Sequence, residues 1–143
     1  MSQFKTSEPI KCESLETAYA IFGDAWLFLK KTAFVLDNYE TWCNVRNEAV
    51  EICIKYNRSR LASKVLVAVI CEAERRSKNN STYRIAKNAD LPREAEIFSA
   101  IWKYYQHLYE GNEKTCFGDT PFEKDLYEVI NSIDFVNAKV TVA

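Results

Sequence analysis

RLASKVLVAVICEAERRSK, residues 60–78, is the stretch that decides the fold of this chain. Its middle, residues 65–71, holds only aliphatic residues, alanine and cysteine, so a helix there would be apolar on every side. The β-branched residues would also suit a strand, but the helix-forming residues on both flanks favour a helix. A helix that is apolar all round is typical of a buried element. We therefore predict a helix over 60–78 and expect it to be the central buried element.

The rest of the chain shows apolar residues at the spacing typical of helices packed on a core. Helices are expected at about 15–36, 39–56, 83–89 and 92–110, and from Pro121 onward. Ser14 and Thr120 are suitable N-caps, and Gly111 suits a helix end. Only three Gly and three Pro occur, which leaves little material for the turns of an all-β fold. The sequence therefore predicts an all-α fold, a compact antiparallel bundle or orthogonal array of about five to six helices.

The bulk composition indicates one soluble domain. The hydrophobic fraction of 48% and the charged fraction of 27% are ordinary for a globular protein. We predict a single domain over 1–143, with flexible ends at 1–13 and 135–143. No signal segment and no apolar run long enough for a membrane span is found, so we expect a cytoplasmic protein without membrane contact.

The cysteines and the histidine do not form a metal-binding pattern. The five cysteines lie at 12, 43, 53, 71 and 116, without a CxxC pair, and the chain has one histidine, His107. We expect the cysteines to be reduced and to act as small hydrophobic residues. No metal site and no cofactor is predicted.

Charge is segregated along the chain, although the net charge is only −1. Residues 55–93 hold three acidic residues and ten basic ones: Lys55, Arg58, Arg60, Lys64, Arg75, Arg76, Lys78, Arg84, Lys87 and Arg93. The residues before and after this segment are net acidic. This pattern predicts a surface for an anionic partner, or self-association through opposite charges.

The first predicted helix carries apolar residues on a second side. Leu27 and Phe34 project roughly opposite to its main apolar stripe, which is typical of a helix that offers a second face to a partner. The predicted contact residues are therefore Leu27, Phe34, Arg58, Arg60, Lys64, Arg75 and Arg76. Our main hypothesis is a non-enzymatic protein–protein interaction module whose partner has an acidic surface. Small helical proteins without catalytic groups often come from phages or mobile elements as inhibitors of host machinery, and we assign the chain to that class as a hypothesis.

A second hypothesis is nucleic-acid binding. Residues 83–91, YRIAKNADL, resemble the first half of a helix-turn-helix, with Asp90 in place of the usual turn glycine. The resemblance implies a corner over 83–110, with phosphate contacts from Arg84, Lys87 and Arg93. The second half departs from the pattern, because the segment that would enter the groove begins PREAE, with two acidic residues.

A third hypothesis is a nucleotide or anion site. Arg46 lies inside the apolar stripe of the second helix near Trp42, so it must reach solvent, pair with an acid or form a buried anion pocket. Glu48-x-x-Glu51 resembles half of the carboxylate motif of MazG-type pyrophosphohydrolases, but no ExxD follows. Because one histidine must serve every catalytic scheme and no phosphate loop occurs, we predict that the chain is not an enzyme.

Overall fold

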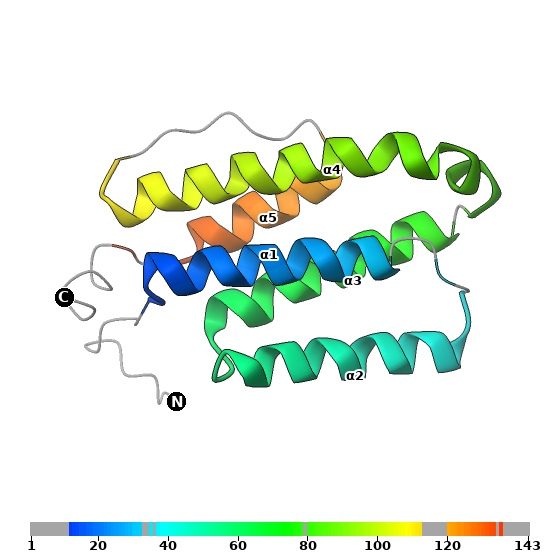
Figure 1. Cartoon of the computed structure of the whole chain (residues 1–143), viewed down its shortest axis with the longest axis horizontal. Coiled ribbons are helices and arrows are strands. Elements are labelled where there is room, and N and C mark those ends of the chain that lie inside the picture. Colours follow the sequence, from blue (N-terminus) through cyan, green and yellow to red (C-terminus); the bar gives the residue numbers. More distant parts are fainter. Residues whose placement is uncertain are drawn as a thin grey trace.

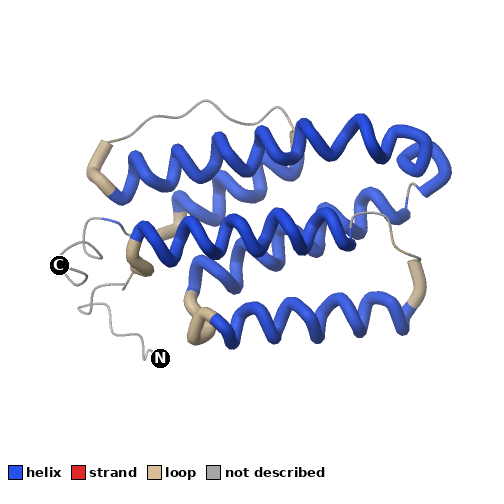
Figure 2. The backbone as a smooth tube through the Cα atoms, viewed as in Figure 1, coloured by secondary structure: helices blue, strands red, loops and turns tan. Residues whose placement is uncertain are grey.

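The computed structural model describes residues 12–32, 35, 37–78, 80–112, 120–133 and 135, with the backbone alone for residues 80–92. Within these residues the chain forms α-helices and no strand (Figure 2). The helices are α1 (Leu15–Thr32), α2 (Tyr39–Lys55), α3 (Arg60–Lys78), α4 (Asn80–Tyr109) and α5 (Pro121–Asn131). Figure 1 shows α1, α3, α4 and α5 packed as a bundle, with α2 along one edge. The prediction of an all-α bundle is confirmed.

Helix α3 is the centre of the bundle and begins and ends where the sequence predicted. It packs against each of the other four helices. Leu61, Val65, Leu66 and Val69 are fully or almost fully buried. The expectation that the middle of α3 is buried on every side is wrong, however, because Val67 is 55% exposed and Cys71 is exposed. Four neighbouring helices leave one edge of α3 uncovered.

Aromatic side chains fill the core between α1, α4 and α5. Phe22, Phe28, Tyr105 and Phe122 are buried. Phe135 is buried as well, and its ring centroid lies 5.1 Å from that of Tyr105. Flexibility of the predicted ends, 1–13 and 135–143, stays a prediction; of these residues the structure describes 12, 13 and 135.

Side-chain caps start three of the helices. The Ser14 hydroxyl accepts a hydrogen bond from the Thr17 amide (3.1 Å), and the Thr120 hydroxyl accepts one from the Glu123 amide (3.1 Å). Both caps were predicted. At the start of α2, the Asn38 side chain accepts from the Thr41 amide. Each cap satisfies a backbone N–H that has no partner inside its helix.

Two predicted helix boundaries are wrong. Val35 is not helical, so α1 ends before the predicted boundary at Leu36. Helix α4 runs without interruption from Asn80 to Tyr109, where we expected a short helix, a turn at 90–92 and a second helix. Pro92 removes one backbone hydrogen bond from a helix interior, and the good helix formers around it continue the helix. None of the described helices is both long and apolar enough to span a lipid bilayer.

Candidate functional site

The uncovered edge of α3 forms an apolar ridge, which we define as Val67 and Cys71. On one side the ridge borders a groove of about 330 Å³ between α2 and α3. The lining residues of this α2–α3 groove are Arg46, Ala49, Val50, Cys53, Ser63, Leu66, Val67, Ile70 and Cys71. Val50 and Ile54 extend the apolar surface along α2, with 47% and 49% of their surface exposed. The central helix thus presents apolar side chains to solvent at its middle, not at a frayed end.

A second groove lies on the other side of the ridge, between α3 and α5. Its volume is about 530 Å³. The lining residues of this α3–α5 groove are Arg60, Lys64, Val67, Ala68, Cys71, Arg75, Asp125, Glu128, Val129 and Ser132. Val67 and Cys71 belong to both grooves. The ridge and its two grooves are therefore one continuous surface, which we call the ridge face.

Three of the predicted cationic contact residues surround one end of the ridge face. Arg60 and Lys64 line the α3–α5 groove, and Arg58 lies in the turn that leads into α3. Burial raises the pKa of the Cys53 thiol in the α2–α3 groove. The positive charge of Arg58 opposes this rise and offsets part of it. All three side chains are exposed. Within the described part of the chain, no carboxylate lies within ion-pair distance of any of them.

The backbone of the turn between α2 and α3 is strained at Arg58. Asn57 and Arg58 have φ angles of 57° and 56°, in the left-handed region. The Arg58 amide donates to the Cys53 carbonyl (2.7 Å), and the Asn57 amide donates to the Ile54 carbonyl (2.9 Å). These two bonds form a Schellman motif, which normally places glycine at one of these positions. Asparagine tolerates this conformation better than arginine does, so an arginine is held at a position that a smaller residue would occupy more easily.

Arg75 and Arg76, also predicted as contact cations, are both paired with carboxylates of this chain. Arg76 is only 3% exposed; its Nε donates to Glu72 (2.8 Å), and its Nη2 pairs with Glu94. Arg75 bridges Glu72 (2.6 Å) and Asp125 (2.5 Å). Burial alone lowers the pKa of the Arg76 guanidinium, but the two glutamates outweigh it and raise the pKa above its usual value. The prediction that Arg76 is a surface cation is wrong, because carboxylates from α3 and α4 enclose it.

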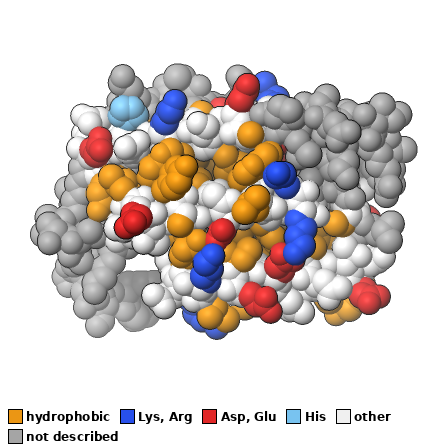
Figure 3. Space-filling model, viewed as in Figure 1, with side chains coloured by type: hydrophobic (Ala, Val, Ile, Leu, Met, Phe, Trp, Pro, Cys, Tyr) orange, Lys and Arg blue, Asp and Glu red, His pale blue; other side chains and the backbone are white. Residues whose placement is uncertain are grey.

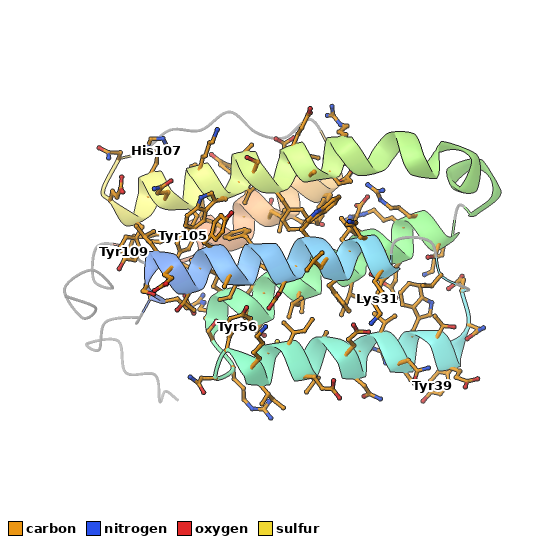
Figure 4. All side chains as sticks on the ribbon, in the orientation of Figure 1. Lys31, Tyr39, Tyr56, Tyr105, His107 and Tyr109 are labelled. Atoms are coloured by element: carbon orange, nitrogen blue, oxygen red, sulfur yellow. The ribbon has the colours of Figure 1, made fainter. Side chains whose placement is uncertain are left out.

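Leu27 is exposed, as predicted, but it does not belong to the ridge face. It is 58% exposed and lines a shallow groove between α1 and α2. The ion pairs Lys31–Glu48 (2.7 Å) and Lys55–Asp24 (2.9 Å) also line this groove and join the two helices. Figure 4 shows Lys31 extending from α1 toward α2. Phe34, predicted as the companion of Leu27, lies outside the described residues.

A hydrogen-bonded cluster around Asp24 accompanies these ion pairs. The Tyr56 hydroxyl donates to Asp24 (2.5 Å), beside the bond from Lys55. Burial alone raises the pKa of Asp24, but the hydrogen bonds from Tyr56 and Lys55 outweigh it and lower the pKa below its usual value. The groove around Leu27 is therefore a helix–helix seam whose charges already have partners.

The predicted anion pocket between Arg46 and Trp42 does not form. Trp42 is buried, and its indole N–H donates to Asp37 (2.7 Å). Arg46 is exposed and lines the α2–α3 groove. Of the three outcomes considered for Arg46, the side chain takes the first and reaches solvent, because its long aliphatic stem crosses the apolar stripe. Arg46 therefore joins the cations of the ridge face.

The predicted helix-turn-helix corner is also absent, since α4 is continuous through residues 90–92. Arg93 is exposed. The side chains of Arg84 and Lys87 lie outside the described part of the structure, so their predicted phosphate contacts stay predictions.

The sequence reasoning missed the apolar members of the ridge face. The sequence held two signals for them. The middle of α3 is apolar on every side, and Val50 and Ile54 lie four residues apart on α2, outside its main apolar stripe. In comparisons with protein-family models, curated proteins and solved structures, nothing matched this chain.

Proposed function

We propose that this chain is a non-enzymatic protein-interaction module that binds an acidic partner protein through the ridge face. The observation that carries the proposal is an apolar ridge on the central helix, between two grooves and beside cations that lack carboxylate partners in the described structure. An apolar anchor inside a charged rim is the usual composition of a protein interface. The protein would act by covering the partner's surface, as an inhibitor or a scaffold does.

The apolar residues supply the anchor. Val50, Ile54 and Val67 each keep about half of their surface exposed. Full burial of such a side chain is worth roughly 1.5–3 kcal/mol, so covering the exposed half contributes about 1 kcal/mol for each residue. Three such residues, with the half-buried Ile70 beside them, support an interface of modest affinity before any polar contact is counted.

The cations select the partner. Arg46, Arg58, Arg60 and Lys64 are exposed around the ridge, and no described carboxylate pairs with them. Unpaired cations around an apolar surface favour an acidic partner and accelerate its association. On the α5 wall, Asp125 and Glu128 line the same groove. Acidic side chains of the partner would therefore lie at the Arg60 end of the ridge and avoid the α5 wall.

Affinity capture with matched variants tests the proposal. Wild-type protein, Val67→Glu and Arg60→Glu are immobilised, and proteins captured from a native lysate are compared. Leu27→Glu is the control for Val67→Glu, because both change an exposed apolar residue to an acid. Lys103→Glu is the control for Arg60→Glu, since Lys103 is an exposed cation on α4. We expect acidic partners to be retained by the wild type and by both controls, and to be lost with both ridge-face variants.

Other outcomes would identify another function. Capture that is unchanged by Val67→Glu and Arg60→Glu would refute the ridge face as the contact. Captured nucleic acid, with a steep loss of binding as salt is added, would instead support the nucleic-acid hypothesis. Size-exclusion chromatography with light scattering on the purified protein tests self-association, and a dimer that Val67→Glu dissociates would identify a second copy as the partner.

A further inference from the structure

A further groove, between α1 and α4, is lined mainly by aromatic rings and shares no residue with the ridge face. Its volume is about 230 Å³, and its lining residues are Tyr19, Phe22, Gly23, Trp26, Ala95, Phe98, Ser99 and Trp102. Rings of the two helices meet across it: the ring centroids are 5.3 Å apart for Tyr19 and Trp102, and 5.9 Å apart for Trp26 and Phe98. Figure 3 shows hydrophobic side chains gathered along α1 and α4 on this face. Tyr19 is 64% exposed.

Gly23 leaves the floor of this groove open. It lies inside α1, where glycine is less favourable than alanine because it loses more conformational freedom on folding. A crossing helix would explain the glycine, but a Cβ atom placed there would meet no atom within 4 Å. Packing within the described structure therefore gives no reason for glycine at this position. An occupant that lies against the backbone of α1 would give such a reason, because a side chain at position 23 would block it.

Each polar side chain of the groove can donate a hydrogen bond, and its two hydroxyls can also accept one. The polar groups are the hydroxyls of Tyr19 and Ser99 and the indole N–H groups of Trp26 and Trp102, and no carboxylate lines the groove. In the described structure these four side chains have no hydrogen-bond partner. Water can satisfy these donors in the free protein, but an occupant that covers them must offer acceptors in place of that water. The groove thus combines flat aromatic faces with donors that an occupant would have to match.

We propose that the α1–α4 groove binds a proline-rich segment of a partner protein in the polyproline II conformation. Such a segment offers backbone carbonyls as acceptors, and proline has no N–H to compete for them. Its rings pack on aromatic faces, and its preformed conformation costs little entropy on binding. The groove extends from Tyr19 to Trp26, about 10 Å along a helix. At 3.1 Å per residue, that length matches about three to four prolines.

Other occupants match the groove less well. A helix uses its carbonyls in its own hydrogen bonds, so it would leave the four donors without acceptors. A cation would compete with Lys30, whose ammonium already lies 5.6 Å from the Trp26 ring centroid.

Nuclear magnetic resonance of the indole N–H groups tests this proposal. Decaproline is added to the ¹⁵N-labelled protein, and an alanine-rich helical peptide serves as the control. The indole signals of Trp26 and Trp102 should shift until they saturate. The signal of Trp42 should stay in place, because its ring is buried and its N–H is bonded to Asp37.

Gly23→Leu supplies the matched variant. Leucine fills the groove floor, and because it is a better helix former than glycine it should raise the melting temperature while it abolishes the shifts. Ala20→Leu changes an exposed residue of α1 outside the groove and should bind as the wild type does. Three results would overturn the proposal: no shift with decaproline, an equal response of Gly23→Leu, or saturable binding of the helical peptide instead. Val67→Glu should bind decaproline normally, so this test is independent of the ridge face.

Discussion

Replacing Arg58 by glycine should stabilise the fold and weaken partner binding at the same time. Arg58 has a φ of 56°, a conformation that costs a residue with a side chain roughly 1–2 kcal/mol and costs glycine almost nothing. Glycine also makes the unfolded chain more flexible, which reduces the gain in the free energy of unfolding by about 0.4–1 kcal/mol. The structure therefore predicts a net stabilisation of about 0.5–1 kcal/mol for Arg58→Gly. For a domain near this size, that corresponds to a rise in Tm of about 1–4 °C.

Asn57→Gly is the matched control. Asn57 has nearly the same φ, but asparagine tolerates the left-handed region, so its gain in stability should be smaller. Urea unfolding followed by circular dichroism gives both changes, with the slope against urea expected to be unchanged. The affinity for a captured partner should decrease for Arg58→Gly, which removes a cation, and should be unchanged for Asn57→Gly. A less stable Arg58→Gly would refute the strain argument. An Arg58→Gly variant that binds like the wild type would refute a contact by Arg58.

Four further results are expected from the described contacts. Arg76→Ala leaves Glu72 and Glu94 without their buried cation and should cost about 3–5 kcal/mol in urea unfolding; a cost below 1 kcal/mol would contradict the burial of this pair. Thr120→Ala removes the cap of α5 and should cost about 1 kcal/mol by the same assay. The pKa of Asp24 is lowered in the folded state, so its stabilising effect is complete above its unfolded pKa of about 4 and is lost as the pH falls further; Asp24→Asn should reduce the loss of stability in acid. Iodoacetamide should modify the exposed Cys71 faster than Cys53, whose pKa is raised by burial, and equal rates measured by mass spectrometry would contradict the exposure of the ridge.

The elements of the fold could be predicted because their signals are local. The apolar run of α3, the Ser14 and Thr120 caps and the Gly111 terminus each depend on a few neighbouring residues. The turn at 90–92 could not be predicted correctly, since Asp90 and Pro92 suit a corner as well as a helix that continues past a proline. The helix formers on both sides of Pro92 continue the helix past it, and their effect was given too little weight against the two turn residues.

The fate of each cation could not be predicted, because it depends on carboxylates from distant parts of the chain. Arg60 and Arg76 lie on the same helix and look alike in the sequence. Arg76 meets Glu94 of α4, and Arg75 meets Asp125 of α5, whereas no described acid reaches Arg60. The charge pattern therefore predicted a basic surface, and ion pairs with distant carboxylates removed Arg75 and Arg76 from it. The packing of the helices left Val67 and Cys71 uncovered, which a fully apolar helix had not led us to expect.

Protection of Cys71 tests the central claim most directly. Cys71 forms the ridge with Val67, while Cys12 lines neither groove of the ridge face and serves as the internal reference. The ratio of their alkylation rates is measured in buffer and in native lysate that contains the partner. Our account predicts that Cys71 becomes selectively protected in lysate, and that Arg60→Glu restores its reactivity. An equal ratio in buffer and in lysate would mean that no partner covers the ridge, and the proposed function would be wrong.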